Sequence, residues 1–180
     1  MKKLMSLGGN YFQQTLVKRA KEMGIYVIDV DYLPDNPAHK YADEYHNISI
    51  VEKEQVLELA RKLKIDGIVS YASDVGAPTA AYVAEKMGLP TNPYDTVLLM
   101  ARKHLFHPFL KKRGFYVPRV QEVYSDQDVL NFYNSVNKDV IIKPVNSSGS
   151  KGVCRISSHE QINKAYEDAK KICQRRKNNC

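Results

Sequence analysis

Hydrophobic and polar positions along the first half of the chain alternate between a strand period and a helix period. Short apolar runs predict buried strands over residues 2–6, 25–29, 45–50 and 67–71. The segments between them repeat apolar residues every three or four positions, which predicts helices over residues 11–23, 53–64 and 78–87. Strands that alternate with helices in this way predict a small doubly wound α/β domain with a parallel sheet.

The second half of the chain has a different order of elements. Residues 96–113 predict a helix that Pro108 kinks or breaks early, and residues 120–124 predict a strand. Ser125 is the expected N-cap of a helix over residues 126–135. A β-hairpin over residues 139–156 and a last helix over residues 159–175 complete the pattern.

This order predicts three parts. They are a Rossmann-like domain over residues 1–93, a linking helix and extended segment over residues 94–118, and a small α+β subdomain with a glycine-rich hairpin over residues 119–180.

The composition is that of an ordinary globular chain, with 43% hydrophobic and 26% charged residues. No apolar run approaches the roughly 20 residues that a membrane-spanning helix needs, and the apolar start is too short for a signal peptide. We therefore expect a cytoplasmic protein without a membrane partner. The three cysteines and five histidines show no metal-ligand spacing, and we expect the histidines at the surface or in caps.

The net charge of +7 is concentrated near the end of the chain, in Lys170, Lys171, Arg175, Arg176 and Lys177. A basic tail is compatible with nucleic-acid binding or with the solvated end of a terminal helix. No nucleic-acid recognition motif accompanies it, so we favour the helix end.

The predicted hairpin carries the strongest chemical signal in the sequence. Its first strand ends in Lys143-Pro144, and a loop of small residues, 146–152, follows. Successive backbone N–H groups in such a loop can form a concavity for an anion, and a lysine at the strand end adds a positive charge. These features predict a loop that covers the phosphates of a nucleotide. An ordinary flexible hairpin turn is the alternative, and the loop alone does not decide between them.

A second set of candidates follows the predicted strands of the first domain, at the edge where doubly wound folds bind ligands. Gly8 and Gly9 follow the first strand and serve either a ligand or a tight turn. Asp29, with Asp31 after it, either binds ribose or substrate or simply ends the second strand. Ser73 and Asp74 follow the fourth strand and form a candidate substrate loop.

Three features in order along the chain resemble the ATP-grasp ligases, which include biotin carboxylase, the carbamoyl-phosphate synthase large subunit and the purine-pathway carboxylate–amine ligases. They are the first domain with its Gly8-Gly9 turn, the segment 101–118, and the hairpin with its glycine-rich loop. In that family a helix with an Asp-Lys pair leads to a strand similar to Gly-Ile-Pro-x-Pro. Lys103 occupies the lysine position and residues 114–118 match the strand, whereas Arg102 replaces the aspartate, so no role for that acid is carried over.

The resemblance implies roles for particular residues. Lys103 and Lys143 would contact ATP, and the loop would fold over its phosphates through Ser147, Ser148, Gly149, Ser150 and Gly152. The first domain would help to bind a small carboxylate substrate through Gly8, Gly9, Asp29, Ser73 and Asp74. The family reaction converts a carboxylate and ATP into an acyl phosphate, which a nucleophile, usually an amine, then attacks.

In the family, the ligands of Mg²⁺ lie C-terminal to the glycine-rich loop, and nothing after Ile156 matches them. We therefore expect the N-terminal part of an ATP-dependent ligase, a truncated or split product that is inactive alone, with the magnesium ligands supplied from elsewhere. The competing hypothesis is a non-catalytic nucleotide-binding or small-ligand module, or a subunit that a second chain completes. Either a homodimer or a complementary chain would cover the apolar surface that such a half-built fold exposes.

Overall fold

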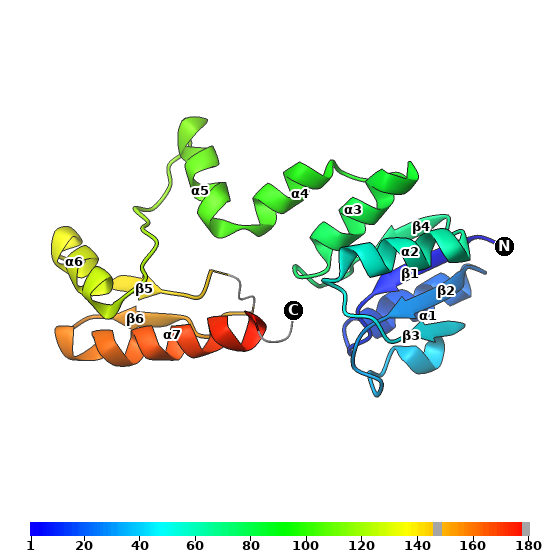
Figure 1. The fold of residues 1–180 in the computed structure, drawn as a ribbon, viewed down its shortest axis with the longest axis horizontal. Helices are drawn as coiled ribbons and strands as arrows, with labels where there is room; N and C mark the ends of the chain where they lie inside the picture. Colours follow the sequence, from blue (N-terminus) through cyan, green and yellow to red (C-terminus); the bar gives the residue numbers. More distant parts are fainter. Residues whose placement is uncertain (146–148, 178–180) are drawn as a thin grey trace. The chain divides into compact units, whose positions relative to one another are not determined.

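The structure is a computed structural model that describes residues 1–145 and 149–177, with side chains described as far as Cys173. The chain divides into two compact units, which we call unit 1 (Met1–Ala101) and unit 2 (Arg102–Cys180). Unit 1 is a mixed α/β body around a parallel sheet, and unit 2 is a smaller body in which helices pack on a hairpin (Figure 1). The predicted α/β fold class is confirmed.

Unit 1 is built on four parallel strands in the order β3-β2-β1-β4. They are β1 (Lys3–Leu7), β2 (Tyr26–Val30), β3 (Glu44–His46) and β4 (Gly67–Val69). In the pairing of β1 with β2, Ser6 lies opposite Asp29. Because all four strands run the same way, the loops that follow them meet at one carboxyl edge.

Helices cover both faces of this sheet. On one face, α1 (Gln13–Glu22) packs Val17 and Ala20 against Val27, beside the short 3₁₀ turn η1 (His39–Tyr41). On the other face, α2 (Lys53–Leu63) and α3 (Ala77–Met87) bury the larger core. That core contains Met5, Leu7, Ile28, Val30, Val56, Leu57, Ala60, Ile65 and Val83. The alternation of side chains along each strand supplies both faces with apolar groups.

Two helices occupy the region where the sequence predicted one. Unit 1 ends with α4 (Tyr94–Ala101), and unit 2 begins with α5 (Lys103–Lys112) after an extended residue, Arg102. Of the two alternatives expected at Pro108, the break was wrong, because the chain leaves helical geometry at Arg102 and Pro108 lies inside α5; a kink at Pro108 stays a prediction. Gly114 ends this segment as predicted, with a φ of 81° that favours glycine.

Unit 2 continues with α6 (Asp126–Val136), the antiparallel strands β5 (Val140–Ile142) and β6 (Cys154–Ile156), the turn η2 (His159–Gln161) and α7 (Ile162–Lys177). Ser125 caps α6 as predicted: its hydroxyl accepts from the Asp128 amide at 3.1 Å, and the Asp128 carboxylate accepts from the Ser125 amide at 3.0 Å.

The predicted strand over residues 120–124 was wrong. This segment is irregular, and Val120 and Tyr124 are exposed. A strand needs a neighbour to accept its backbone hydrogen bonds, and the described sheet of unit 2 contains only β5 and β6.

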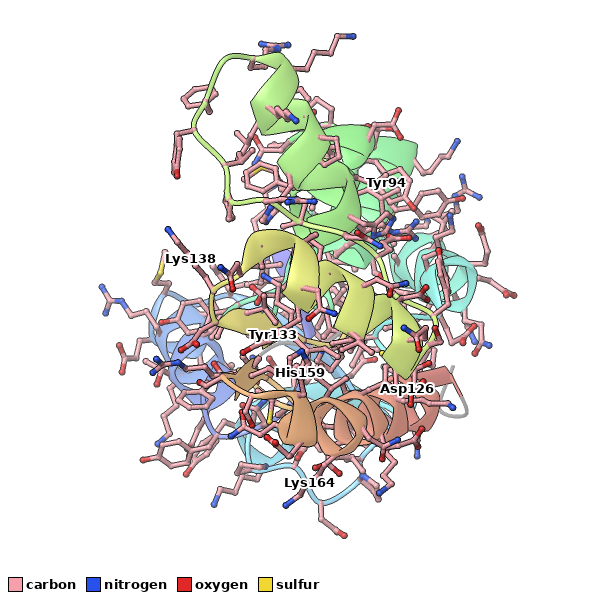
Figure 2. All side chains as sticks on the ribbon, turned by 90° about the vertical axis from the view of Figure 1, so that its left-hand side faces the viewer. Tyr94, Asp126, Tyr133, Lys138, His159 and Lys164 are labelled. Carbon is pink, nitrogen blue, oxygen red and sulfur yellow. The ribbon has the colours of Figure 1, made fainter. Side chains whose placement is uncertain are left out.

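One face of the β5–β6 hairpin packs against α6 and α7. Val140, Ile142 and Ile156 point into that core, together with Val129, Ile162, Ala165 and Ala169. Figure 2 shows Tyr133 of α6 beside His159 of η2. The Tyr133 hydroxyl donates to the Ser157 carbonyl at 2.8 Å, and the His159 ring nitrogen Nε2 lies 2.8 Å from the Asn134 side-chain oxygen. These contacts fasten α6 to the segment that follows β6.

The basic residues of α7 that the structure describes lie on a solvated helix surface. Lys170 pairs with Glu167 at 3.5 Å and Lys171 with Asp168 at 3.7 Å, and all four side chains are exposed. Among the described residues, no helix has the length and apolar character that a membrane span requires.

We expect Gly152→Ala to destabilise the chain more than Gly149→Ala. Both glycines have a left-handed backbone, with φ values of 72° and 66°, so alanine costs about 1 kcal/mol at either position. A Cβ at Gly152 would also lie 2.9 Å from Pro144 Cγ and 2.6 Å from the end of Ile172, whereas a Cβ at Gly149 meets nothing within 4 Å among the described residues. This overlap adds about 1–3 kcal/mol. Urea unfolding of both variants measures the difference, and equal losses would contradict it.

Candidate functional site

The candidate site of unit 1 is the carboxyl edge of its sheet. The loops after β1 (residues 8–12), β2 (residues 31–38) and β4 (residues 70–76) leave three strands that are neighbours in the sheet. The structure therefore brings the predicted residues Gly8, Gly9 and Asp29 together. It places Ser73 and Asp74 in the loop that follows the adjacent strand.

A buried carboxylate, Asp31, fixes the loop after β1 to the loop after β2. Asp31 is 7% exposed, and its Oδ2 accepts from the Gly9 amide at 2.9 Å. Its Oδ1 accepts from the Leu33 amide at 3.0 Å. Both oxygens are thus occupied by backbone donors, which gives Asp31 a structural role in this chain.

Asp29 lies below this loop on the α1 face of the sheet and contacts His39. The carboxylate is fully buried, and its Oδ2 lies 2.8 Å from Nδ1 of His39, whose side chain is only 9% exposed. The other ring nitrogen, Nε2, lies 2.8 Å from the Leu33 carbonyl oxygen. The ring also stacks on Tyr45 at 3.8 Å between centroids. The prediction of a surface or capping histidine was wrong for His39.

The geometry assigns a proton to the Asp29–His39 pair. A carbonyl oxygen only accepts, so Nε2 must carry a hydrogen to bind Leu33. The contact between Nδ1 and Asp29 then needs one more proton, held either by a neutral carboxyl group or by a cationic ring. Burial is the largest influence and raises the pKa of Asp29 to about 6, although His39 opposes the shift. The Ser6 hydroxyl also lowers this pKa slightly, but it is not in good hydrogen-bond geometry with Asp29.

The Gly8-Gly9 turn is determined by these neighbours. A Cβ at Gly9 would lie 2.2 Å from the His39 ring and 3.0 Å from Asp29 Oδ2, so no larger residue fits here without displacing the pair. Gly8 has a φ of 102°. The turn is tight, as one of the two sequence interpretations expected, and its role in substrate binding stays a prediction.

The loop after β4 is held at the same edge by a hydrogen bond from Gln13 of α1. The fully buried Gln13 donates from its side-chain nitrogen to the Tyr71 carbonyl, and its oxygen Oε1 has no hydrogen-bond partner among the described residues. The Ser70 hydroxyl donates to the Ser73 carbonyl at 2.9 Å. Asp74 is exposed. The substrate roles of Ser73 and Asp74 stay predictions.

Sequence reasoning did not find His39 or Gln13. Both side chains are ordinary in the sequence, and their importance comes from contacts with other loops. The position of His39, nine residues after a strand whose apolar run contains Asp29, is the signal that could have found it.

The second candidate site is the face of the β5–β6 hairpin that points away from the unit 2 core. Lys143 is exposed on this face, directly after β5. Exposed Ile141, Val145 and Val153 lie on the hairpin with it. In the loop, Gly149, Ser150 and Gly152 all have positive φ, between 55° and 72°. Ser147 and Ser148 lie outside the described residues.

Lys103 is the first residue of α5 in unit 2, after the extended residue Arg102. Its contact with ATP, like that of Lys143, stays a prediction. In the part of the chain that the structure describes, no three His, Cys, Asp or Glu side chains are grouped to hold a metal ion.

Comparison with known proteins identifies relatives that match most of the chain, although no family model matches it. The chain is 27% identical over 169 residues to the formate-dependent phosphoribosylglycinamide formyltransferase of Pasteurella multocida. This match includes 93% of the chain but only 43% of the relative, so the chain spans less than half the length of the curated relatives it matches.

Solved structures show the same relationship. The N5-carboxyaminoimidazole synthetase of Staphylococcus aureus, solved with ADP, superposes with a TM-score of 0.75 at 19% identity, over 94% of this chain and 45% of that one. A biotin carboxylase domain dimer from Hydrogenobacter thermophilus, solved with MgADP and bicarbonate, gives 0.68 at 18% identity, over 93% and 40%. These similarities confirm the predicted resemblance to the N-terminal part of ATP-grasp ligases.

We expect the stability of unit 1 to fall as Asp29 ionises. The pKa of Asp29 is 3.8 in the unfolded chain and about 6 in the folded one. The protonated carboxyl group therefore contributes fully to the free energy of unfolding below about pH 3.8, and this contribution is lost as the pH rises through 6. Relative to Asp29→Asn, the wild-type free energy of unfolding should drop by about 3 kcal/mol across this range. Urea unfolding at several pH values measures the difference. Asp35→Asn controls for removal of one carboxylate, and a constant difference between wild type and Asp29→Asn would contradict the prediction.

Proposed function

We propose that this chain provides the acceptor-binding and phosphate-contacting parts of an ATP-grasp ligase, which joins a carboxylate to a nucleophile, usually an amine, through an acyl phosphate. The observation that carries the proposal is the hairpin of unit 2, where an exposed lysine adjoins a glycine-rich loop in a chain similar to ATP-grasp ligases. In this proposal, unit 2 contacts ATP, and the carboxyl edge of unit 1 binds the part of the substrate that lies away from its reacting carboxylate.

The outer face of the hairpin suits a nucleotide because it combines apolar and cationic groups. Ile141 of β5 and Val145 and Val153 beside the loop are 58%, 48% and 43% exposed, and they offer an apolar surface to a flat base. Lys143 adds a positive charge at the end of β5. Arg155, on the same face opposite Ile141, pairs with Asp139, so Lys143 is the better candidate for a phosphate.

The loop supports the same proposal through its backbone. Left-handed residues turn successive N–H groups toward a common side, as in other anion-binding loops. Gly149 and Ser150 have this conformation, and a side chain at Gly149 would meet nothing within 4 Å among the described residues. The loop can therefore approach a phosphate closely. Lys103 is the second proposed cation, at the start of α5.

Phosphoryl transfer depends mainly on positioning and on charge neutralisation. In the proposed reaction, the residues of this chain hold the phosphates and the acceptor, and Mg²⁺ supplies further neutralisation when it accompanies ATP. Because no group of three His, Cys, Asp or Glu side chains that could hold a metal ion occurs among the described residues, we assign the metal no ligand among them. We propose that its ligands, and full turnover, require a further segment or a second chain.

We expect Mg-ATP to bind the 180-residue chain and Lys143→Ala to weaken binding by tenfold or more. A charged hydrogen bond contributes about 1.5–3 kcal/mol, and each 1.4 kcal/mol is about tenfold in the dissociation constant. Isothermal titration calorimetry measures this effect. Lys138→Ala is the matched control, because Lys138 is exposed at the other end of the hairpin, before β5 (Figure 2), and should bind as the wild type does.

Equal affinities in the Lys143→Ala variant and the wild type would contradict the assignment of Lys143. If the wild-type chain binds no Mg-ATP at all, the hairpin alone is not a nucleotide site, and the alternative of a subunit that a second chain completes gains support.

A further inference from the structure

The two glycine amides at the carboxyl edge of unit 1 already have acceptors within the chain. The Gly8 amide donates to the Val30 carbonyl at 2.8 Å, and the Gly9 amide donates to Asp31. The Phe12 amide donates to the Asn10 side chain at 2.8 Å. A phosphate-binding turn needs these N–H groups directed at the ligand. In this turn the amides of Gly8, Gly9 and Phe12 instead donate to acceptors within the chain.

The charge at the same edge also opposes an anion. Residues 8–17, 31–38 and 70–85, which follow β1, β2 and β4, contain no lysine or arginine. They do contain Asp31, Asp35 and Asp74, of which Asp35 and Asp74 are exposed. A doubly charged phosphate would therefore meet repulsion, whereas a cation would be attracted.

Aromatic side chains are exposed on all three of these loops. Four of them are between 45% and 74% exposed: Tyr11, Phe12, Tyr32 and Tyr71. Single exposed aromatics are normal, but a group on neighbouring loops at a ligand-binding edge indicates a recognition surface. Aromatic faces bind planar or apolar groups, and they attract cations.

Three fully buried side-chain atoms near this edge have no partner among the described residues, and one of them, the Ser6 hydroxyl, can donate as well as accept. Gln13 Oε1 and Asp29 Oδ1 are fully buried and have no partner among the described residues. Gln13 Oε1 lies beneath the turn, 3.7 Å from the position of a Cβ at Gly8. Unpaired buried oxygens are costly, and their partial negative charge adds to the attraction of this edge for a cation.

We infer that the carboxyl edge of unit 1 recognises a small molecule that presents a cationic amine beside a planar or apolar group, and that it rejects phosphorylated ligands. The inference rests on the proposed function, in which the acceptor is a carboxylate substrate. It concerns the end of that substrate that lies away from the reacting carboxylate. The exposed carboxylate of Asp74 would attract the ammonium group of the ligand, and the four aromatic side chains would contact its planar or apolar part.

The test uses three probes in NMR titrations of the ¹⁵N-labelled chain. Phenethylamine has a ring and an ammonium group, 3-phenylpropionate has a ring and a carboxylate, and ribose 5-phosphate has a phosphate and no ring. We expect phenethylamine to cause saturable shifts in residues 8–12, 31–38 and 70–76, and the two anions to bind more weakly. Binding of ribose 5-phosphate as tight as that of phenethylamine, or no saturable shift with phenethylamine, overturns the inference.

Variants separate the charge contribution from the aromatic one. Asp74→Asn and Tyr71→Ala should each weaken phenethylamine binding by about threefold or more. Glu58→Gln, an exposed carboxylate on α2, and Tyr116→Ala, a fully exposed tyrosine of unit 2, are the matched controls and should leave binding unchanged. Equal binding by all four variants and the wild type overturns the inference.

The result is distinguishable from a failure of the proposed function. Mg-ATP binding that depends on Lys143 tests unit 2, and the probes test unit 1. Intact nucleotide binding without amine recognition would overturn only the inference about the acceptor. Loss of both would overturn the ligase proposal as well.

Discussion

The hydrogen bond from the Gly9 amide to the buried Asp31 carboxylate is the contact on which the arrangement of the carboxyl edge depends. It joins the loop after β1 to the loop after β2, and the Asp29–His39 pair closes the space beneath it. A side chain at position 9 would collide with that pair, so the buried Asp29–His39 contact can form only if position 9 is glycine. Two buried acidic groups are costly, and the backbone and imidazole donors around them offset that cost.

The two candidate sites differ in how they use backbone donors and charge. Unit 1 holds 11 Lys and Arg against 13 Asp and Glu, whereas unit 2 holds 16 against 7. In the glycine turn of unit 1, the Gly9 amide donates to Asp31 and the Gly8 amide to the Val30 carbonyl. The exposed face of the hairpin in unit 2 carries Lys143. Electrostatics alone therefore directs a polyanion toward unit 2 and away from the edge of unit 1.

Most of the fold could be predicted because its strands and helices have clear hydrophobic periods and clear end signals. The parallel strands of unit 1, the cap at Ser125 and the stop at Gly114 all depend on neighbours in sequence. The strand over residues 120–124 was predicted wrongly because β-propensity says nothing about whether a partner strand exists. The break at Arg102 escaped prediction for a similar reason: no glycine or proline marks it. Of the candidate site, the sequence indicated the correct loops, but it could not show that His39 reaches Asp29, since that contact depends on side-chain directions at a strand end.

A pair of glycines after a first β-strand has two physical meanings, and only the destination of the N–H groups distinguishes them. If the amides are unpaired, the turn binds an anion; if a carboxylate of the next strand accepts them, the turn is already filled by an anion of the protein itself. Asp31 is that internal anion here, because its two oxygens accept from Gly9 and Leu33. To reach the Gly9 amide, an external phosphate would have to displace Oδ2 of the buried Asp31 carboxylate, and an unpaired buried carboxylate oxygen is costly. Because the glycine amides already have acceptors, the groups that remain for a ligand at this edge are aromatic faces and exposed carboxylates. Together these groups suit a cationic ligand.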